Sequence, residues 1–153
     1  MNIKKNSKWS ILFVMALTFM FTTSAFAQQV IEMTGTDKMK FTVEEITAKP
    51  GEEITVKLYT DSKLPAVAMG HNFVLLKQGV DGTQFANASA RHKDNDFLDP
   101  SKMDEVLAHT KMGNGGETVE VTFNAPDKVG EYEYICTFPG HYASGMKGVL
   151  TVK

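Results

Sequence analysis

The sequence predicts an all-β protein: a Greek-key β-sandwich or barrel with a short helix in a crossover flap. Three observations lead to this prediction. Apolar residues recur with a period of two in several short segments. Glycine, proline and aspartate separate these segments as turns. Residues 78–110 lack the period of two, which is typical of an excursion from the sheets. No internal repeat or low-complexity linker divides the sequence, so we expect a single domain over residues 28–153.

The first 27 residues are predicted to be an export signal. Three lysines precede an apolar run at residues 11–21, and Ala25–Ala27 supplies small residues for cleavage. The run is shorter than the roughly 20 residues of a membrane-spanning helix, although a retained N-terminal anchor stays open as an alternative. We therefore expect a periplasmic protein whose mature chain is not stably inserted in a membrane.

Five segments after the predicted signal carry the alternating or apolar pattern of strands: residues 54–58, 71–77, 119–123, 131–136 and 146–153. In the fourth segment, the alternation places Tyr132, Tyr134 and Cys136 on one side, which we expect to face the core. Within the long excursion, residues 100–109 have apolar positions at helical spacing after the potential caps Asp99 and Ser101. The short helix is expected there.

Acidic and basic residues are interspersed, and the formal net charge of the full sequence is −2. This balance gives no reason to expect a nucleic-acid partner. Cys136 is the only cysteine, so an exported chain cannot use it for an internal disulfide. Such a residue is a buried small hydrophobe, a link to another chain, a nucleophile or a metal ligand.

The neighbours of Cys136 favour a metal ligand. His141 and Met146 follow it in one predicted loop, with four residues between each donor and the next. A thiolate, an imidazole and a thioether form a donor set suited to copper, whereas a thioether is a poor ligand for zinc. The best candidate for a fourth donor is His71, at the start of a predicted strand.

Three segments resemble the azurin family of cupredoxins: "LPAVAMGHNFVL" (64–75), "VLAHTKMGNGGE" (106–117) and "CTFPGHYASGMKGVLTVK" (136–153). The resemblance implies a cupredoxin-like fold around one type 1 Cu(II)/Cu(I) ion. It also implies the ligands, which are His71, Cys136 and His141 in the equatorial plane, with the Met146 thioether and the Gly70 carbonyl on the axis. The gap of four residues between His141 and Met146 is one residue longer than is typical of azurins, which affects the expected axial bond.

Hydrogen bonding predicts roles for residues beside the ligands, and the resemblance implies a docking surface. The backbone N–H groups of Asn72 and Phe138 are expected to point at the cysteine sulfur. The outer edge of His141 is expected near the surface, as the port for electrons. Around it we expect an apolar patch that docks redox partners, with the members Leu64, Met69, Phe138, Pro139 and Tyr142.

The sequence therefore predicts an electron carrier and not an enzyme. Its expected partners are redox proteins, such as c-type cytochromes or copper- and haem-containing reductases and oxidases, and it is expected to be a monomer. Two alternatives stay open. Cys136 and a histidine could serve as nucleophile and base in a thiol hydrolase, although that chemistry does not require Met146. A copper-delivery or storage module is the other, although several thiols or thioethers would then be expected to converge.

Overall fold

The computed structural model describes residues 28–153, and the predicted export signal at residues 1–27 lies outside the described residues. The strands are β1 (Gln29–Thr36), β2 (Lys40–Phe41), β3 (Glu45–Ala48), β4 (Glu53–Asp61), β5 (Val74–Leu76), β6 (Val106–His109), β7 (Thr118–Asn124), β8 (Gly130–Ile135) and β9 (Lys147–Val152). The helices are α1 (Ala66–Met69) and α2 (Gly82–Ser89), with short 3-10 helices η1 (Lys93–Asn95) and η2 (Pro100–Glu105).

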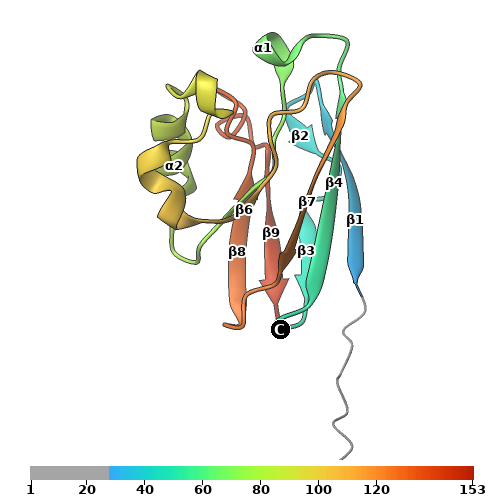
Figure 1. The fold of residues 1–153 in the computed structure, drawn as a ribbon, viewed down its shortest axis with the longest axis vertical. Coiled ribbons are helices and arrows are strands. Elements are labelled where there is room, and N and C mark those ends of the chain that lie inside the picture. Colours follow the sequence, from blue (N-terminus) through green and yellow to red (C-terminus); the bar gives the residue numbers. More distant parts are fainter. Residues whose placement is uncertain (1–27) are drawn as a thin grey trace, which may run out of the picture.

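The strands form two sheets that face each other as a sandwich (Figure 1). One sheet has the order β2-β1-β4-β7, and the other has the order β3-β9-β8-β5-β6. Parallel pairs join β1 to β4 and β3 to β9, while the remaining pairs are antiparallel. The all-β sandwich prediction is confirmed, in the form of two open sheets and not of a closed barrel.

The main core lies between the two sheets, where the alternating residues of each strand meet. Ile54, Val56 and Leu58 of β4 have no exposed surface. From the opposite sheet, Tyr134 and Cys136 join the same cluster, and both are fully buried. The prediction that Tyr134 and Cys136 face the core is therefore confirmed. Cys136 lies at one end of the sandwich.

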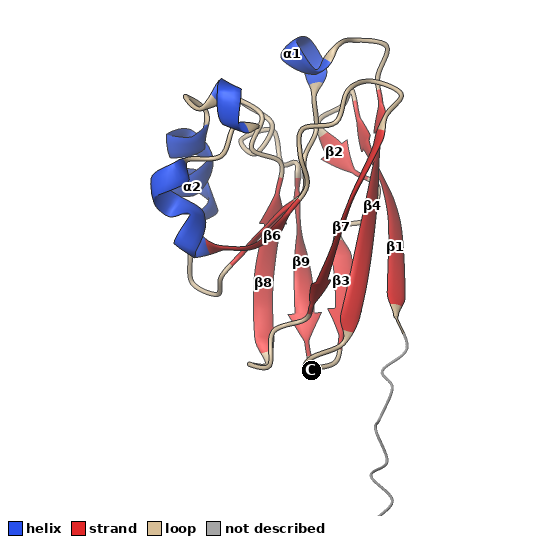
Figure 2. Ribbon diagram, in the orientation of Figure 1, coloured by secondary structure: helices blue, strands red, loops and turns tan. Residues whose placement is uncertain are grey.

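The excursion between β5 and β6 forms a helical flap beside one sheet, as Figure 2 shows. Its α-helix is α2, which the sequence did not predict. Asp81 caps its N-terminus, and the Asp81 carboxylate accepts hydrogen bonds from the N–H groups of Thr83 and Gln84. The helix expected over residues 100–109 was wrong in its second half. Residues 100–105 form η2, capped by Asp99 as anticipated, but residues 106–109 pair with β5 as β6.

The flap gives the second sheet a second buried face. Val74, Leu76 and Ile135 point away from the main core, yet none of them is exposed. They pack with Phe85 of α2 and Leu98 of the flap in a separate apolar cluster. β5 is thus apolar on both sides, which explains why it reads as a continuous apolar run. Within residues 28–153, no helix has the length and apolar character needed to cross a membrane.

Candidate metal centre

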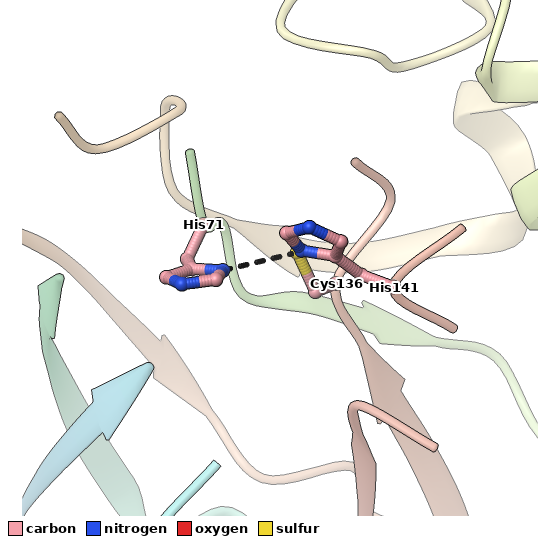
Figure 3. Close-up of side chains that lie close together, drawn as sticks. All are labelled: His71, Cys136 and His141. Carbon is pink, nitrogen blue, oxygen red and sulfur yellow. Dashed lines mark hydrogen bonds between the residues drawn. The ribbon is translucent and has the colours of Figure 1, made fainter. Parts of the chain in front are cut away.

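The candidate ligands gather at one end of the sandwich, from two distant parts of the chain. Cys136 directly follows β8, and His141 lies in the loop that leads to β9. His71 lies just before β5, where its backbone forms an isolated bridge with Gly113. Figure 3 shows the three side chains directed toward one another. The structure therefore brings together three of the predicted donors across a sequence separation of 65 residues.

Backbone hydrogen bonds shape the loop between β8 and β9. The N–H of Cys136 donates to the Met146 carbonyl over 3.1 Å, so the two ends of the loop are closed on each other. The N–H of Met146 in turn donates to the His141 carbonyl over 3.0 Å. Gly140 and Gly145 have positive φ angles of 85° and 88°, a conformation that favours glycine. The loop is a tight, self-bonded turn and not a flexible linker.

The donor geometry fits one metal ion. The Cys136 Sγ atom lies 3.5 Å from His141 Nδ1 and 4.0 Å from His71 Nδ1. All three donor atoms lie within 4.8 Å of one another, and all three residues are buried. With metal–sulfur and metal–nitrogen bonds of about 2.3 and 2.0 Å, a sulfur and a nitrogen that bind one ion are separated by at most about 4.3 Å. Both sulfur–nitrogen distances satisfy this limit.

Burial keeps all three donors uncharged in the metal-free protein. It lowers the pKa of His71 to about 4, against a smaller opposing effect of Asp37. Burial, with a smaller effect of His71, also lowers the pKa of His141 to about 4. Neutral imidazoles present free lone pairs at neutral pH. The pKa of Cys136 is raised to about 12 by burial, so a metal must displace the thiol proton when it binds.

Two backbone N–H groups oppose that rise of the cysteine pKa. Hydrogen bonds from the backbone of Asn72 and of Phe138 to the sulfur lower it in part. These are the two donors that the sequence analysis had expected. Each of them stabilises negative charge on the sulfur, as a metal-bound thiolate requires.

The Asn72 side chain ties the two ligand segments together. It is fully buried, and its carbonyl oxygen accepts a hydrogen bond of 2.9 Å from the backbone N–H of Thr137. Its amide nitrogen donates to Thr137 Oγ1 over 2.8 Å and to the Asp96 carbonyl over 3.1 Å. One side chain thus links the segment of His71, the loop after Cys136 and the flap.

The surface around the site differs in part from the prediction. His141 is only 2% exposed, so the expected surface position of its ring was wrong. The Phe138 ring lies over it with a centroid separation of 4.5 Å, and Phe97 of the flap packs edge-on against Phe138 at 5.2 Å. Of the predicted docking residues, Leu64 and Pro139 are exposed, while Met69 and Tyr142 are half-buried.

Sequence analysis missed two residues beside the site. Phe97 lies in a stretch without periodicity and has a positive φ of 55°, so no sequence pattern pointed to it. Gly35, in β1, lies against His71 and Met146. A glycine inside a strand is a recognised sign of close approach, but residues 29–36 were not among the predicted strands.

A surface network holds the segment before His71. The Ala66 N–H donates to Asn114 Oδ1 over 3.1 Å, and the Asn114 N–H donates to Glu117 Oε2 over 3.0 Å. The Lys111 ammonium lies 2.6 Å from Glu117 Oε1. Lys111 is the main reason why the pKa of Glu117 falls from its ordinary value of 4.5 to about 2, and the Asn114 hydrogen bonds add to it.

Glu117→Gln is expected to make the thermal stability of the protein depend less on pH in the acid range. Because the folded pKa of Glu117 is depressed, its stabilising effect is fully present above pH 4.5 and disappears as the pH falls through about 2. Above pH 5, the wild type should melt about 1–5 °C higher than the variant, given the small energy of a surface ion pair. This difference should vanish near pH 2. Thermal melts of the metal-free proteins across this range test it, and parallel pH profiles would contradict it.

The fold and the site together define a class. A buried cysteine and two neutral histidines, at the end of a two-sheet β-sandwich, are the donor set of mononuclear blue-copper sites. The family described as "Copper binding proteins, plastocyanin/azurin family" matches residues 27–153. The chain belongs to this family of copper-binding proteins, which confirms the predicted resemblance and the copper cofactor.

Relatives and solved structures agree with this assignment. The chain is 41% identical to Azurin-1 of Alcaligenes xylosoxydans xylosoxydans over 125 residues, covering 78% of this chain and 94% of the relative. It is 40% identical to azurin of Pseudomonas aeruginosa over 126 residues, covering 80% of this chain and 84% of the relative. The structure of auracyanin A from Chloroflexus aurantiacus, described as a "blue" copper protein, is similar with a TM-score of 0.74. That match has 34% identity and covers 83% of this chain and 100% of auracyanin A.

Proposed function

We propose that this protein carries single electrons between redox proteins through one copper ion held by His71, Cys136 and His141. The observation that carries the proposal is the buried cluster of Cys136 Sγ with two imidazole Nδ1 atoms, at 3.5 and 4.0 Å from the sulfur. We propose that the Met146 thioether and the Gly70 carbonyl would add to the donors that hold this ion. Both residues are buried and adjoin the equatorial donors in the chain or in space.

The chain's own residues prepare the site for electron transfer. Copper, when bound, supplies a one-electron Cu(II)/Cu(I) couple. The closed loop and the Asn72 side chain hold the donors in place, so the ligand cage moves little when the charge changes. The backbone N–H groups of Asn72 and Phe138 stabilise charge on the sulfur. Phe138 and Phe97 exclude water from the His141 side.

We propose that electrons pass through the end of the sandwich that carries the ligand loop. Leu64 is 46% exposed there, and Val67, which the sequence analysis did not include, is 66% exposed. A small apolar surface suits brief encounters of less than about 1,200 Å², because an electron carrier must release its partner quickly. Such encounters suit a monomer whose partners are c-type cytochromes or copper- and haem-containing reductases and oxidases.

We further propose that the chain is exported to the periplasm, where residues 1–27 are removed, and that it is a carrier and not an enzyme. The fully buried Cys136, with its raised pKa, is poorly suited to attack a substrate as a thiol nucleophile. This supports the carrier over the hydrolase that the sequence had left open.

Optical spectroscopy of the copper-loaded protein tests the proposed function. With Cu(II) bound, we expect an intense absorption band in the red part of the visible spectrum, arising from charge transfer from the Cys136 thiolate. One equivalent of reductant should bleach the band, and a redox protein added as oxidant should restore it over repeated cycles. A colourless Cu(II) complex, or a complex that bleaches without recovery, would contradict the proposal.

Met146→Leu is expected to keep the colour and to raise the reduction potential. Leucine is close to methionine in volume but offers no sulfur, so the axial thioether is lost while the packing is kept. Electrochemistry of the two copper-loaded proteins measures the shift, and Met103→Leu, in the flap, is the matched control. An unchanged potential in Met146→Leu would place the thioether outside the coordination sphere.

A further inference from the structure

Gly35 brings a bare stretch of backbone against two of the proposed ligands. It lies in β1, where it pairs with Thr60 of β4 and with Phe41 of β2. A Cβ atom added to Gly35 would lie 2.7 Å from His71 Cδ2, 2.8 Å from His71 Cγ and 2.9 Å from Met146 Cε. Distances below 3.0 Å are not observed for real Cβ atoms, so any side chain here must displace a neighbour.

Backbone conformation does not explain this glycine. Six other glycines of the described residues have positive φ angles, but Gly35 does not. Gly35 is the last residue but one of β1, and a glycine within a strand weakens the strand, because it orders a flexible residue and adds no side-chain packing. The close approach to His71 and Met146 is therefore the physical reason for a glycine at this position.

The His71 ring lacks the usual polar restraint. A metal-ligating histidine ordinarily donates its second ring N–H to a carboxylate, a carbonyl or water, which fixes the ring orientation. In residues 28–153, the buried Nε2 atom of His71 has no hydrogen-bond partner. The backbone of His71 is held by its bridge to Gly113, but that bridge does not by itself set the orientation of the ring.

We propose that Gly35 is a positioning residue for the metal site. Its open face seats the imidazole of His71 so that Nδ1 points toward Cys136, and the same face seats the terminal methyl group of Met146. Packing against β1 thus takes the place of a hydrogen bond to Nε2. The expected effects on copper affinity and on the visible spectrum rest on the proposed copper site. The expected effect on stability concerns the metal-free protein alone.

The two side chains that Gly35 contacts, Met146 and His71, differ in how easily they can move away from an added Cβ atom. Met146 Cε is the end of a flexible side chain and can move aside at low cost. The His71 ring is stiff and fully buried, and its Cγ and Cδ2 atoms cannot retreat without moving Nδ1. Gly35→Ala should therefore act mainly through the His71 ring, which a double-mutant cycle can isolate.

The first experiment uses metal-free protein. Gly35→Ala is expected to raise the unfolding equilibrium constant roughly 10-fold or more, as overpacking of a filled core does. In the His71→Ala background, which removes the ring, the same substitution should raise it less than about 3-fold, because the contact it disturbs is gone. Urea denaturation of the wild type, Gly35→Ala, His71→Ala and the double variant gives the four unfolding equilibrium constants of the cycle. An equal effect in both backgrounds would overturn the proposal. If the single variant Gly35→Ala does not fold, a folded double variant with His71→Ala supports the proposal. A double variant that also does not fold overturns it.

The second experiment uses copper-loaded protein. Gly35→Ala should weaken Cu(II) binding at least about 10-fold in competition with a chelator, since the displacement of one of three strong ligands removes much of the affinity. It should also shift the visible spectrum. Gly82→Ala is the matched control, because its added Cβ would press on Glu133 and Tyr142 and on no proposed ligand. Wild-type affinity and an unshifted spectrum in Gly35→Ala would overturn the positioning role. A wild type without the intense band would instead count against the proposed function, and the metal-free cycle would still decide the role of Gly35.

Discussion

Replacing Cys136 by serine should abolish the intense visible absorption of the Cu(II) protein and weaken copper binding by several orders of magnitude. The thiolate is the only soft anionic donor among the three clustered residues, and the charge-transfer band depends on it. Serine fits the cavity left by cysteine, but its hydroxyl does not ionise near neutral pH. The variant keeps two neutral imidazoles and loses the ligand that holds Cu(II) most strongly.

The visible absorption spectrum of the Cys136→Ser protein with Cu(II) tests the loss of the band, and competition with a chelator measures its copper affinity. His109→Asn is the matched control, because His109 is exposed and lies outside the donor cluster, so its loss should leave the colour and the affinity unchanged. An intense red-region band that persists in Cys136→Ser would mean that copper binds elsewhere. Circular dichroism of the metal-free variant would show whether the fold is retained.

Asn72→Ala should lower the free energy of unfolding by about 3 kcal/mol, since it leaves several buried polar groups without partners at once. The N–H and the hydroxyl of Thr137 lose the bonds of 2.9 and 2.8 Å, and the Asp96 carbonyl loses the bond of 3.1 Å. Thr137 is 1% exposed, so water cannot replace these bonds without a local opening of the structure.

Urea denaturation of the metal-free proteins gives the size of this loss. Asn87→Ala, at an exposed position of α2, is the matched control and should change the stability by less than about 0.5 kcal/mol. A loss below about 1 kcal/mol for Asn72→Ala would show that the network contributes little to the fold. In the copper-loaded protein, the same variant should release copper faster, because the two ligand segments are no longer joined by this side chain.

Much of the fold and the metal centre could be predicted because each depends on a local pattern. The alternation of Tyr132, Tyr134 and Cys136 has the period of a strand, so it fixed which side of β8 meets the core. The spacing of Cys136, His141 and Met146 placed three donors in one loop. His71 was harder to place, since no local rule brings residues 71 and 136 together. Its position at the start of a predicted strand made it the best candidate, and the resemblance to a known family then implied its ligand role.

The remaining features depend on contacts between distant segments. Residues 106–109 have apolar positions that suit a helix, yet they form β6 because the edge of β5 offers them hydrogen bonds. The burial of His141 depends on how Phe138 and Phe97 lie over it, and sequence spacing does not show this. Gly35 lies in a strand that was not predicted, and the side chains it faces come from residues 71 and 146.

The separation of the donors along the chain sets the order of maturation. The thiol and one imidazole lie near the C-terminus, while the other imidazole precedes β5, and their meeting requires that β8 pair with both β5 and β9. Before these strands have paired, Cys136 and His141 can share an ion only within their own loop, without His71. The complete three-donor centre therefore forms only when the second sheet has assembled, whether an ion joins the loop before or after that step.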